Sequence, residues 1–406
     1  MRVGINCLRI FPTYKGGTNS FTLGLLDAFG RVGAPHEFKV FVTPWNREMF
    51  ERFAAFPHFE VIEVDESDHG WLRAVHKRLP LRLKRRLPVD APSVLNSGPV
   101  DVLEREADVI YVPYVPPPRL FPFTDVSTIY SIHDIQQVHF PEFFTPEELV
   151  EREAAFGKCV EHATVIQASS RYMAGDFCDH FPKLNESNVE VIPEGVDVDL
   201  FSRALPENDV VGRYELPASF LFTPAQLWPH KNHLTILEAL KLLRDRGLVI
   251  PWVLTGAKYG ASDSIFEFIA RNGLEDQTHY LGLVPLEDVI ALHQRARFLV
   301  TASLYESSSI PILEAAAAGT PIIAGRIPPH EEMAEHLEMR LFTPQDAAEL
   351  ADVLAEAWVD EVESESQVAA NRVGIRRYSW DNAALMYLQL FERIGSREPA
   401  LVAERS

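Results

Sequence analysis

The stretch RFLVTASLYESSSIPILEAAAAGTPIIAG, residues 297–325, predicts a strand, a helix and a second strand in succession. Residues 297–303 and 320–325 are short runs of apolar and β-branched residues, which are typical of buried strands. Residues 310–319 predict the helix between them, because Pro311 suits the first turn of a helix, where its missing N–H would have no partner. Strands joined through helices indicate a parallel sheet with helices on both faces.

The same alternation runs through the whole chain of 406 residues, which exceeds one ordinary hydrophobic core. Further strands are expected at residues 2–8, 37–43, 59–65, 108–114, 128–134, 164–169, 219–225, 251–257 and 279–285. The series restarts around residues 200–218, whose mixed polarity and lack of period are typical of a linker. We therefore predict an N-terminal domain over residues 1–205 and a C-terminal domain over residues 206–377, with a helix within residues 378–406 that packs back on the first domain.

Each predicted domain is a doubly wound α/β unit of the Rossmann-like kind. In such sheets ligands bind beyond the carboxyl ends of the strands. With two units of this kind, the cleft that they face is the expected binding site.

Composition and charge restrict the class of protein. The formal net charge of −20 argues against a nucleic-acid-binding protein, which is usually basic. The N-terminus has the pattern of a buried first strand and not of a signal peptide, and no run approaches the ~20 apolar residues of a membrane-spanning helix. The three cysteines, Cys7, Cys159 and Cys178, have no metal-type spacing and fit a reduced compartment. A cytoplasmic location is expected.

The junction before the predicted helix of residues 310–319 could bind a phosphate. Ser308, Ser309 and Ile310 lie at the start of that helix, where free N–H groups and the helix dipole attract anions. Glu306 precedes the turn and Glu314 follows about one turn later, so both carboxylates could bind ligand hydroxyls. A phosphate between two such carboxylates suits a nucleotide sugar. The alternative is an ordinary helix start whose acidic residues serve only the dipole.

The spacing Glu-x7-Glu in residues 304–325 resembles the donor-site signature of family 4 glycosyltransferases, which have the GT-B fold. Other segments resemble the same family in order along the chain: KGGTNSFTLGLLDAF at 15–29, SIHDIQQVHFPEFF at 131–144, VIQASSRYMAGDF at 165–177, VIPEGVDVDLF at 191–201 and TPAQLWPHKNH at 223–233. The resemblance covers most of residues 1–325 and implies a retaining glycosyltransferase with two Rossmann-like domains facing a central cleft.

The resemblance also implies roles for single residues. Lys231 would pair with the diphosphate and stabilise the leaving nucleotide, and His133 would face the reacting sugar. Glu306 would bind hydroxyls of the donor sugar, and Glu314 those of the ribose. The backbone at Gly16 and Gly17 would approach the diphosphate or the acceptor, unless these glycines only form an ordinary turn.

Two departures from the family pattern concern the donor. Gln226 stands where the family usually has an arginine, and His230 or Arg171 could supply the missing charge. The residues after Glu306 are three serines, Ile310 and Pro311, where the family often has Gly-Phe-Gly-Leu-Pro. These differences bear on donor identity more than on the class of reaction.

No metal site or cofactor is expected. Asp197 and Asp199 imitate the Asp-x-Asp metal motif of other glycosyltransferases, but they lie in residues 191–201, where the resemblance implies an inter-domain connection. A helix N-terminus together with Lys231 could stabilise a leaving diphosphate without a cation.

A basic segment, residues 71–88, carries seven Lys or Arg and no acidic residue. Its leucines recur with helical spacing beside Trp71, as in segments that lie on membrane surfaces. Contact with an anionic membrane or a lipid-linked acceptor would involve Trp71, Arg82, Lys84, Arg85 and Arg86. The alternative is a solvated helix whose leucines face the core.

We therefore predict a retaining, metal-independent glycosyltransferase that moves a hexose, mannose from GDP-mannose being the first to test, to a glycan or lipid-linked acceptor of a surface polysaccharide or lipopolysaccharide. Its location would be cytoplasmic, or peripheral on the inner face of the cell membrane. Two alternatives stay open: a nucleotide-sugar epimerase of GT-B fold, and a non-catalytic partner subunit that binds a nucleotide sugar. The donor base, the acceptor, the linkage and the oligomeric state are not determined by the sequence.

Overall fold

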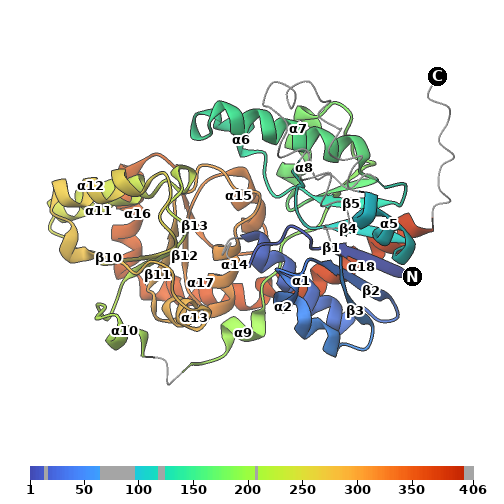
Figure 1. Ribbon diagram of the computed structural model, residues 1–406. Coiled ribbons are helices and arrows are strands. Elements are labelled where there is room, and N and C mark those ends of the chain that lie inside the picture. Colours follow the sequence, from blue (N-terminus) through green and yellow to red (C-terminus); the bar gives the residue numbers. More distant parts are fainter. Residues whose placement is uncertain (13–16, 65–96, 118–123, 206–208, 397–406) are drawn as a thin grey trace. The chain divides into compact units, whose positions relative to one another are not determined.

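The computed structural model describes residues 1–12, 17–64, 97–117, 124–205 and 209–396. It divides into two compact units: unit 1 comprises residues 1–193 and 380–406, and unit 2 comprises residues 194–379 (Figure 1). The sequence predicted the boundary after residue 205, whereas residues 194–205 belong to unit 2. There the N–H of Val196 donates to the carbonyl oxygen of Tyr378 at 2.8 Å.

Unit 1 contains a seven-stranded sheet in the order β3-β2-β1-β4-β5-β6-β7. All its strand pairs are parallel. The strands are β1 (Arg2–Asn6), β2 (Glu37–Val42), β3 (Phe59–Glu63), β4 (Val109–Val112), β5 (Thr128–Ser131), β6 (Val165–Ala168) and β7 (Val189–Val191). The helices are α1 (Gly17–Val32), α2 (Arg47–Phe50), α5 (Ser97–Glu106), α6 (Gln136–His139), α7 (Pro146–His162), α8 (Arg171–His180) and α18 (Trp380–Gly395). The parallel, Rossmann-like architecture predicted from the sequence is confirmed.

The C-terminal helix α18 packs against α1 within unit 1. The rings of Phe21 and Trp380 meet edge to face at 5.5 Å, and Arg31 forms an ion pair with Asp381 at 2.6 Å. Gly24 allows this approach, since a Cβ there would lie 2.5 Å from the Trp380 ring. The chain therefore completes the first unit with its last helix.

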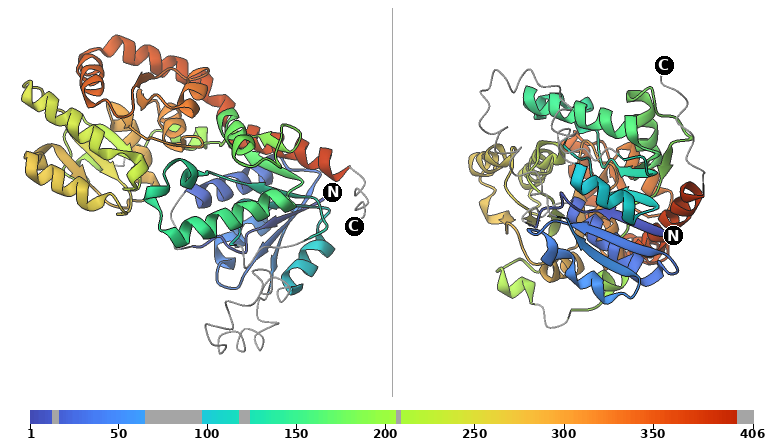
Figure 2. Two further views of the ribbon diagram at one scale, coloured as in Figure 1. Left: turned by 90° about the horizontal axis from the view of Figure 1, so that it is seen from above. Right: turned by 45° about the vertical axis from the view of Figure 1, so that its right-hand side comes forward.

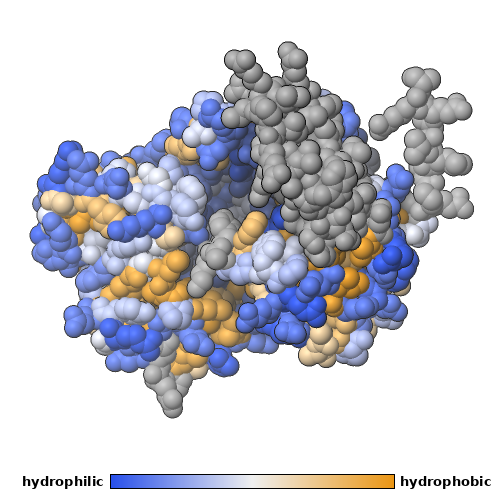
Figure 3. All heavy atoms as spheres, in the orientation of Figure 1, coloured by the Kyte–Doolittle hydropathy of each residue, from blue (hydrophilic) through white to orange (hydrophobic). Residues whose placement is uncertain are grey.

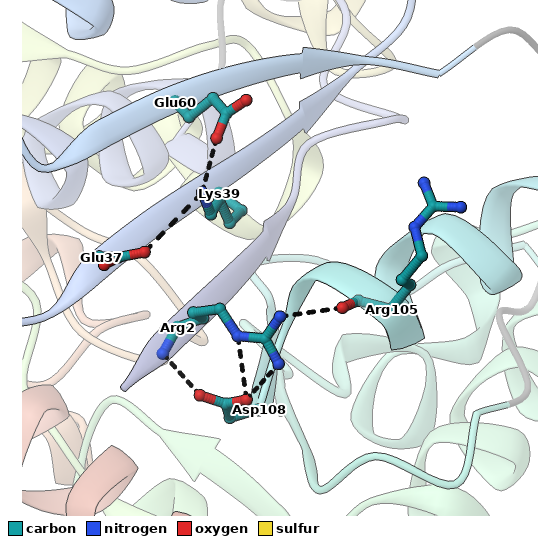
Figure 4. A network of polar contacts seen from close by, with 6 residues as sticks. All are labelled: Arg2, Glu37, Lys39, Glu60, Arg105 and Asp108. Atoms are coloured by element: carbon teal, nitrogen blue, oxygen red, sulfur yellow. Dashed lines mark hydrogen bonds and ion pairs between the residues drawn. The ribbon is translucent and has the colours of Figure 1, made fainter.

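Polar contacts connect the start of β1 to the turn between α5 and β4 (Figure 4). The Arg2 guanidinium binds the Asp108 carboxylate at 2.6 Å, and the backbone N–H of Arg2 donates to the same carboxylate at 2.8 Å. Nearby, Lys39 of β2 pairs with Glu60 of β3 at 2.6 Å. Because the Arg2 and Asp108 side chains are about 41% exposed, this pair contributes on the order of 1 kcal/mol or less.

Unit 2 contains a six-stranded parallel sheet in the order β10-β9-β8-β11-β12-β13. The strands are β8 (Leu221–Pro224), β9 (Trp252–Thr255), β10 (Thr278–Tyr280), β11 (Phe298–Thr301), β12 (Ile322–Gly325) and β13 (Arg340–Phe342). The helices are α9 (Val198–Ser202), α10 (Val210–Arg213), α11 (His233–Asp245), α12 (Ser262–Asn272), α13 (Leu286–Arg295), α14 (Ile310–Ala318), α15 (Pro328–Ala334), α16 (Ala347–Val359) and α17 (Glu361–Gly374). Helices cover both faces of this sheet (Figure 2).

Successive residues of β11 pack on opposite faces of the unit 2 sheet. Val300 of β11 packs in the cluster that contains the apolar sides of α11 and α16, whereas Leu299 packs in the cluster of α14. Both side chains are completely buried, as expected for a parallel sheet with helices on each side. The quoted stretch therefore forms β11, α14 and β12, as predicted.

The surface of unit 2 mixes hydrophilic and apolar side chains on the face drawn in Figure 3. Its exposed large apolar residues include Val249, Leu283 and Leu286, which are 54–57% exposed. Among the described residues, no helix combines the length and hydropathy needed to cross a bilayer. The basic segment of residues 71–88 lies outside the described residues, so the prediction of membrane contact is not addressed by the structure.

Candidate active site

The lysine predicted to bind phosphate lies in the turn that follows β8. Pro229–Lys231 form the short 3-10 helix η5, and Asn232 adopts a left-handed conformation (φ 53°) before α11 begins. The Asn232 amide donates to the carbonyl oxygens of Ala302 at 3.1 Å and Pro344 at 2.7 Å. Asn232 thereby fixes the turn after β8 against the segments that follow β11 and β13.

Lys231 and Glu306 form an ion pair at the carboxyl ends of two neighbouring strands, β8 and β11. Lys231 Nζ lies 2.5 Å from Glu306 Oε1, and the two side chains are only 19% and 13% exposed. The backbone joins the same segments, because the N–H of Leu304 donates to the carbonyl oxygen of His230 at 2.8 Å. In the structure, Glu306 is thus the anion that balances a lysine placed near the N-terminus of α11.

The environment of Glu306 favours its charged form. Burial alone would raise its pKa, but the charges of Lys231 and His230 and the hydrogen bonds from Lys231 and Ser303 hold the pKa below its ordinary value. Glu306 is therefore an ionised carboxylate at neutral pH, able to accept hydrogen bonds from hydroxyl groups.

Helix α14 begins beside this pair. Ser309 is its N-cap and Ile310 its first residue, and the Ser309 side chain makes no capping hydrogen bond. Ser308 and Ser309 are 8% and 3% exposed. Glu306, Ser308, Ser309 and Ile310 thus lie at one helix N-terminus, as the sequence predicted for a phosphate-binding junction.

Glu314 lies on the second turn of α14 and is 18% exposed. Its Oε2 atom is 3.5 Å from Nε2 of His293, which is completely buried beside the ring of Phe222. His293 thus borders one side of the Glu314 carboxylate. The structure brings Glu314 into the same unit as Lys231 and Glu306.

Gln226, the residue at the position of the expected arginine, has an aromatic neighbour. Its Oε1 accepts from Trp228 Nε1 at 2.9 Å, and the Trp228 ring stacks on Tyr259 at 3.9 Å. Gly256 lies against this turn with φ 128°, and a Cβ there would lie 2.4 Å from the Ala225 carbonyl oxygen. Of the two proposed substitutes for the arginine, His230 acts electrostatically on Glu306, whereas Arg171 is the first residue of α8 in unit 1.

Glu194 is a third carboxyl group near the Lys231–Glu306 pair, and the sequence did not identify it. The residue is 7% exposed and forms a side-chain hydrogen bond with Ser308. Burial and the charge of Glu306 raise the pKa of Glu194 to about 7, against the opposing effects of Lys231 and Ser308. A glutamate in VIPEGVDVDLF gives no local signal of this role, because its neighbours belong to segments far along the chain.

His330 is a second residue that the sequence did not identify. It follows β12, is completely buried, and has Nδ1 2.7 Å from the carbonyl oxygen of Gly325. Since a carbonyl only accepts, Nδ1 is the donor and the imidazole is the Nδ1–H tautomer. Burial lowers the pKa of His330, partly countered by the charge of Glu306, so the ring is neutral at physiological pH.

The predicted residues of the N-terminal domain lie in unit 1. His133 follows β5, and its Nε2 donates to the carbonyl oxygen of Pro113 at 3.0 Å, while its ring meets Phe21 edge to face at 4.8 Å. Burial lowers the pKa of His133. Gly17 begins α1, and a Cβ there would meet no described atom within 4 Å, so packing against the described residues does not require glycine. Gly16 lies outside the described residues.

The Asp-x-Asp segment has a structural role in the described part of unit 2. Asp197 is the N-cap of α9, and its Oδ1 accepts from the N–H of Leu200 at 2.9 Å. Among the described residues, no group of three or more His, Cys, Asp or Glu side chains is arranged to hold a metal ion.

Part of unit 2 matches a known protein family. Residues 213–373 match the model of glycosyl transferases group 1. The O-antigen chain mannosyltransferase B of Escherichia coli is 23% identical over 80% of this chain and 84% of its own length. The MMP alpha-(1->4)-mannosyltransferase of Mycolicibacterium hassiacum is 28% identical over 59% of this chain and 56% of its own length.

Solved structures of other proteins share the architecture of this chain. Anabaena Alr3699/HepE in complex with UDP and glucose superposes with a TM-score of 0.69 over 97% of this chain and 100% of that chain, at 17% identity. At this identity the likeness establishes the fold. The chain therefore has the two Rossmann-like units of the GT-B fold, and its residues 213–373 match glycosyl transferases group 1.

Proposed function

We propose that this protein transfers a hexosyl group from a nucleoside diphosphate sugar to a glycan or lipid-linked acceptor of a bacterial surface polysaccharide, with mannose from GDP-mannose as the first donor to test. The observation that carries the proposal is the Lys231–Glu306 pair at 2.5 Å beside the N-terminus of α14. At this position a lysine and a helix N-terminus can bind a diphosphate, and a carboxylate can bind the hydroxyls of a sugar.

The choice of mannose rests on the relatives. Two of them carry mannosyltransferase names, one of which refers to an O-antigen chain. The nucleotide is left open between guanosine and uridine, because the solved neighbour from Anabaena holds UDP.

The reaction exchanges one bond at the anomeric carbon for another. The bond from C1 to the diphosphate oxygen breaks, the acceptor hydroxyl oxygen bonds to C1, and the hydroxyl proton passes to the released diphosphate. Lys231 and the N-terminus of α14 stabilise the charge that builds up on the diphosphate as the bond breaks. Glu306 accepts hydrogen bonds from hydroxyls of the transferred sugar, and Glu314 accepts from those of the ribose.

Retention of the anomeric configuration and independence of metals belong to the same proposal. With retention, the released phosphate guides the acceptor to the face that it leaves, so no carboxylate nucleophile is assigned. Lys231 takes the charge-neutralising role that a divalent cation has in other enzymes. The capping role of Asp197 supports a structural reading of the Asp-x-Asp segment.

Attachment to a membrane surface is proposed from the sequence alone. The seven cations of residues 71–88 would contribute roughly 1 kcal/mol each near an anionic lipid surface. Binding to anionic vesicles that weakens as salt rises would support this part of the proposal, and indifference to such vesicles at low salt would contradict it.

A donor panel measured by thermal shift tests the proposed function. GDP-mannose, GDP, UDP-glucose and UDP are added to the full chain, and the matching donor should raise the Tm, because a ligand that binds the native state stabilises it. Lys231→Ala should abolish the shift, whereas Lys241→Ala, a lysine 41% exposed on α11, should preserve it. A wild-type protein that none of the four compounds stabilises would contradict the proposal. NMR of the product then reports its anomeric configuration.

A further inference from the structure

His293 of α13 is a histidine whose side chain lies in the interior of unit 2. The residue is completely buried, and within the described part of the chain neither Nδ1 nor Nε2 has a hydrogen-bond partner. An imidazole carries an N–H on at least one ring nitrogen, whether it is neutral or charged. A buried donor without an acceptor is destabilising. The ring therefore has an N–H that a nearby acceptor would stabilise.

Glu314 of α14 supplies an acceptor beside this ring. Its Oε2 atom lies 3.5 Å from Nε2 of His293. This separation is about 0.5 Å longer than a typical N–H···O bond, so a small rotation of the carboxylate would close the contact. Because Nδ1 has no partner among the described residues and Nε2 lies near a carboxylate, the surroundings favour the tautomer with the proton on Nε2.

Packing fixes the histidine ring more firmly than the carboxylate. The His293 ring meets Phe222 of β8 edge to face at 5.0 Å and Phe201 of α9 at 6.1 Å. Its backbone carbonyl oxygen accepts from Thr320 Oγ1 at 2.6 Å, which connects α13 to the segment that follows α14. Glu314, by contrast, is 18% exposed and can be reached from solvent. The ring is therefore the fixed partner, and the carboxylate is the group that can turn toward it.

A hydrogen bond from the histidine would leave the carboxylate free to bind hydroxyl groups. The two oxygens of a carboxylate offer about four acceptor positions, so Glu314 can accept from His293 and from ribose hydroxyls at the same time. The bond from His293 would fix the rotation of the carboxylate plane and thus the directions of the remaining lone pairs. Since a hydrogen bond weakens steeply when it is poorly aligned, this orientation determines how well the carboxylate distinguishes a ribose from a sugar that lacks the hydroxyls.

We infer that His293 positions Glu314 for the ribose: its Nε2–H donates to Oε2 of Glu314, and the oriented carboxylate selects nucleoside diphosphates that carry the 2′- and 3′-hydroxyls. The inference rests on the proposed function, in which Glu314 binds the ribose of the donor. His293 is a positioning residue, because it is completely buried and acts through Glu314. Both residues belong to unit 2, so the arrangement is complete within one folded unit.

Calorimetric titration of the full chain with GDP and UDP, and with their 2′,3′-dideoxy forms, tests the inference. The measured quantity is the ribose preference, which is the Kd of the dideoxy nucleotide divided by the Kd of its parent. The wild type should show a preference of about tenfold, as expected for hydrogen bonds to a charged group. His293→Phe keeps a ring beside Phe222 but has no N–H, and it should lower the preference to about threefold. General damage to the fold would weaken both nucleotides alike and leave this ratio unchanged.

Three further variants make the test specific. His293→Gln should restore the wild-type preference, because the amide nitrogen of glutamine can replace the Nε2–H donor. In a Glu314→Ala background, His293→Phe should cause no further change in the preference, since the two residues act as one unit. His279→Phe is the matched control and should keep the wild-type preference: His279 lies on β10 of the same unit, and its buried Nε2 also has no hydrogen-bond partner among the described residues.

Two results would overturn the inference while the proposed transfer stands. One is a wild-type protein that binds the parent and dideoxy nucleotides with equal Kd. The other is a ribose preference that His293→Phe leaves at the wild-type value, or that His293→Gln lowers as much as His293→Phe does. If neither GDP nor UDP binds the wild type, the proposed function fails as well. One variant keeps the ring and the other keeps the N–H, so either one that folds decides the test.

Discussion

The two Rossmann-like units carry different side chains in the segments that follow their strands. In unit 2, β8 and β11 are followed by a charged cluster, in which Lys231 and Glu306 are paired at 2.5 Å and Glu194 lies close by. In unit 1, β5 is followed by His133, whose ring contacts Phe21 and donates to the Pro113 carbonyl. Burial lowers the pKa of His133, so this ring is neutral at physiological pH.

We therefore expect the unit 2 cluster to bind the negatively charged diphosphate, and His133 of unit 1 to act in the transfer step. Lys231 and the N-terminus of α14, which are suited to an anion, lie in unit 2, which also holds residues 213–373, the part that matches the family model. Substitutions in the unit 2 cluster should therefore change nucleotide affinity, whereas substitutions near His133 should change the rate of transfer and leave nucleotide affinity intact.

The largest effect is expected from Lys231→Ala, which removes the cation that we propose to pair with the leaving diphosphate. By analogy with the removal of one electrostatic group from a transition-state site, kcat should fall by about 10²–10³. The measurement is kcat with the matching donor, and Lys241→Ala is the control on α11. Because Lys231→Ala also leaves Glu306 without its partner, the pair Lys231→Ala and Glu306→Gln should be combined in a double-mutant cycle. Turnover near the wild-type rate in Lys231→Ala would place the diphosphate elsewhere.

Glu194→Gln should stabilise the folded protein at high pH. The folded-state pKa is raised from 4.5 to about 7, so the folded protein holds a proton that the unfolded chain releases between these values. Ionisation in the folded state therefore lowers stability as pH rises from 4.5 to 7, by about 3 kcal/mol at most. The variant should have a higher Tm than the wild type at pH 8 and an equal Tm near pH 4.5. A Tm difference that does not vary with pH would contradict the raised pKa.

Glu314→Ala should weaken nucleotide binding with little change in kcat. A ribose contact is equally strong in the ground state and the transition state, so its loss appears in affinity. The loss of a hydrogen bond to a charged group predicts a Kd about tenfold higher. Titration of the nucleotide and steady-state rates measure the two quantities separately. Unchanged affinity with a lower kcat would show that Glu314 does not bind the ribose.

His133→Asn should lower kcat several-fold and leave the nucleotide Kd unchanged. This result is expected if His133 of unit 1 acts in the transfer step and does not bind the nucleotide. His58→Asn is the control, because Nε2 of His58 also contacts a backbone carbonyl oxygen in unit 1, that of Phe29 at 3.1 Å. If His133→Asn weakens nucleotide binding as much as Glu314→Ala does, the separation between the units is wrong.

Asp197→Ala should have the smallest effect. The loss of the N-cap of α9 should cost about 1 kcal/mol of stability, measured by denaturant unfolding. Transfer should persist in the variant and in wild-type protein treated with a strong chelator. Activity that disappears in chelator and returns with Mn²⁺ or Mg²⁺ would reject metal independence.

The local sequence determined the architecture of each unit. Residues 297–325 form a strand, a helix and a strand because apolar periodicity and helix-start chemistry act over a few residues. The same local signals predicted that Glu306, Ser308 and Ser309 share one helix start. The predicted unit boundary differed from the structure, because residues 194–205 join unit 2 through contacts with residues far along the chain, such as the bond from Val196 to Tyr378.

Only the tertiary structure decided which groups meet at the candidate site. The strand order places β8 beside β11, which brings Lys231 against Glu306 across 75 positions of sequence. Glu194 reaches the same region from the segment before α9, and His330 reaches it from helix α15, which follows β12. The protonation of Glu194 depends on burial and on the charge of Glu306, and both arise only when distant segments pack together. Periodicity and capping are properties of neighbouring residues, whereas the electrostatic environment of a carboxyl group is a property of the folded chain.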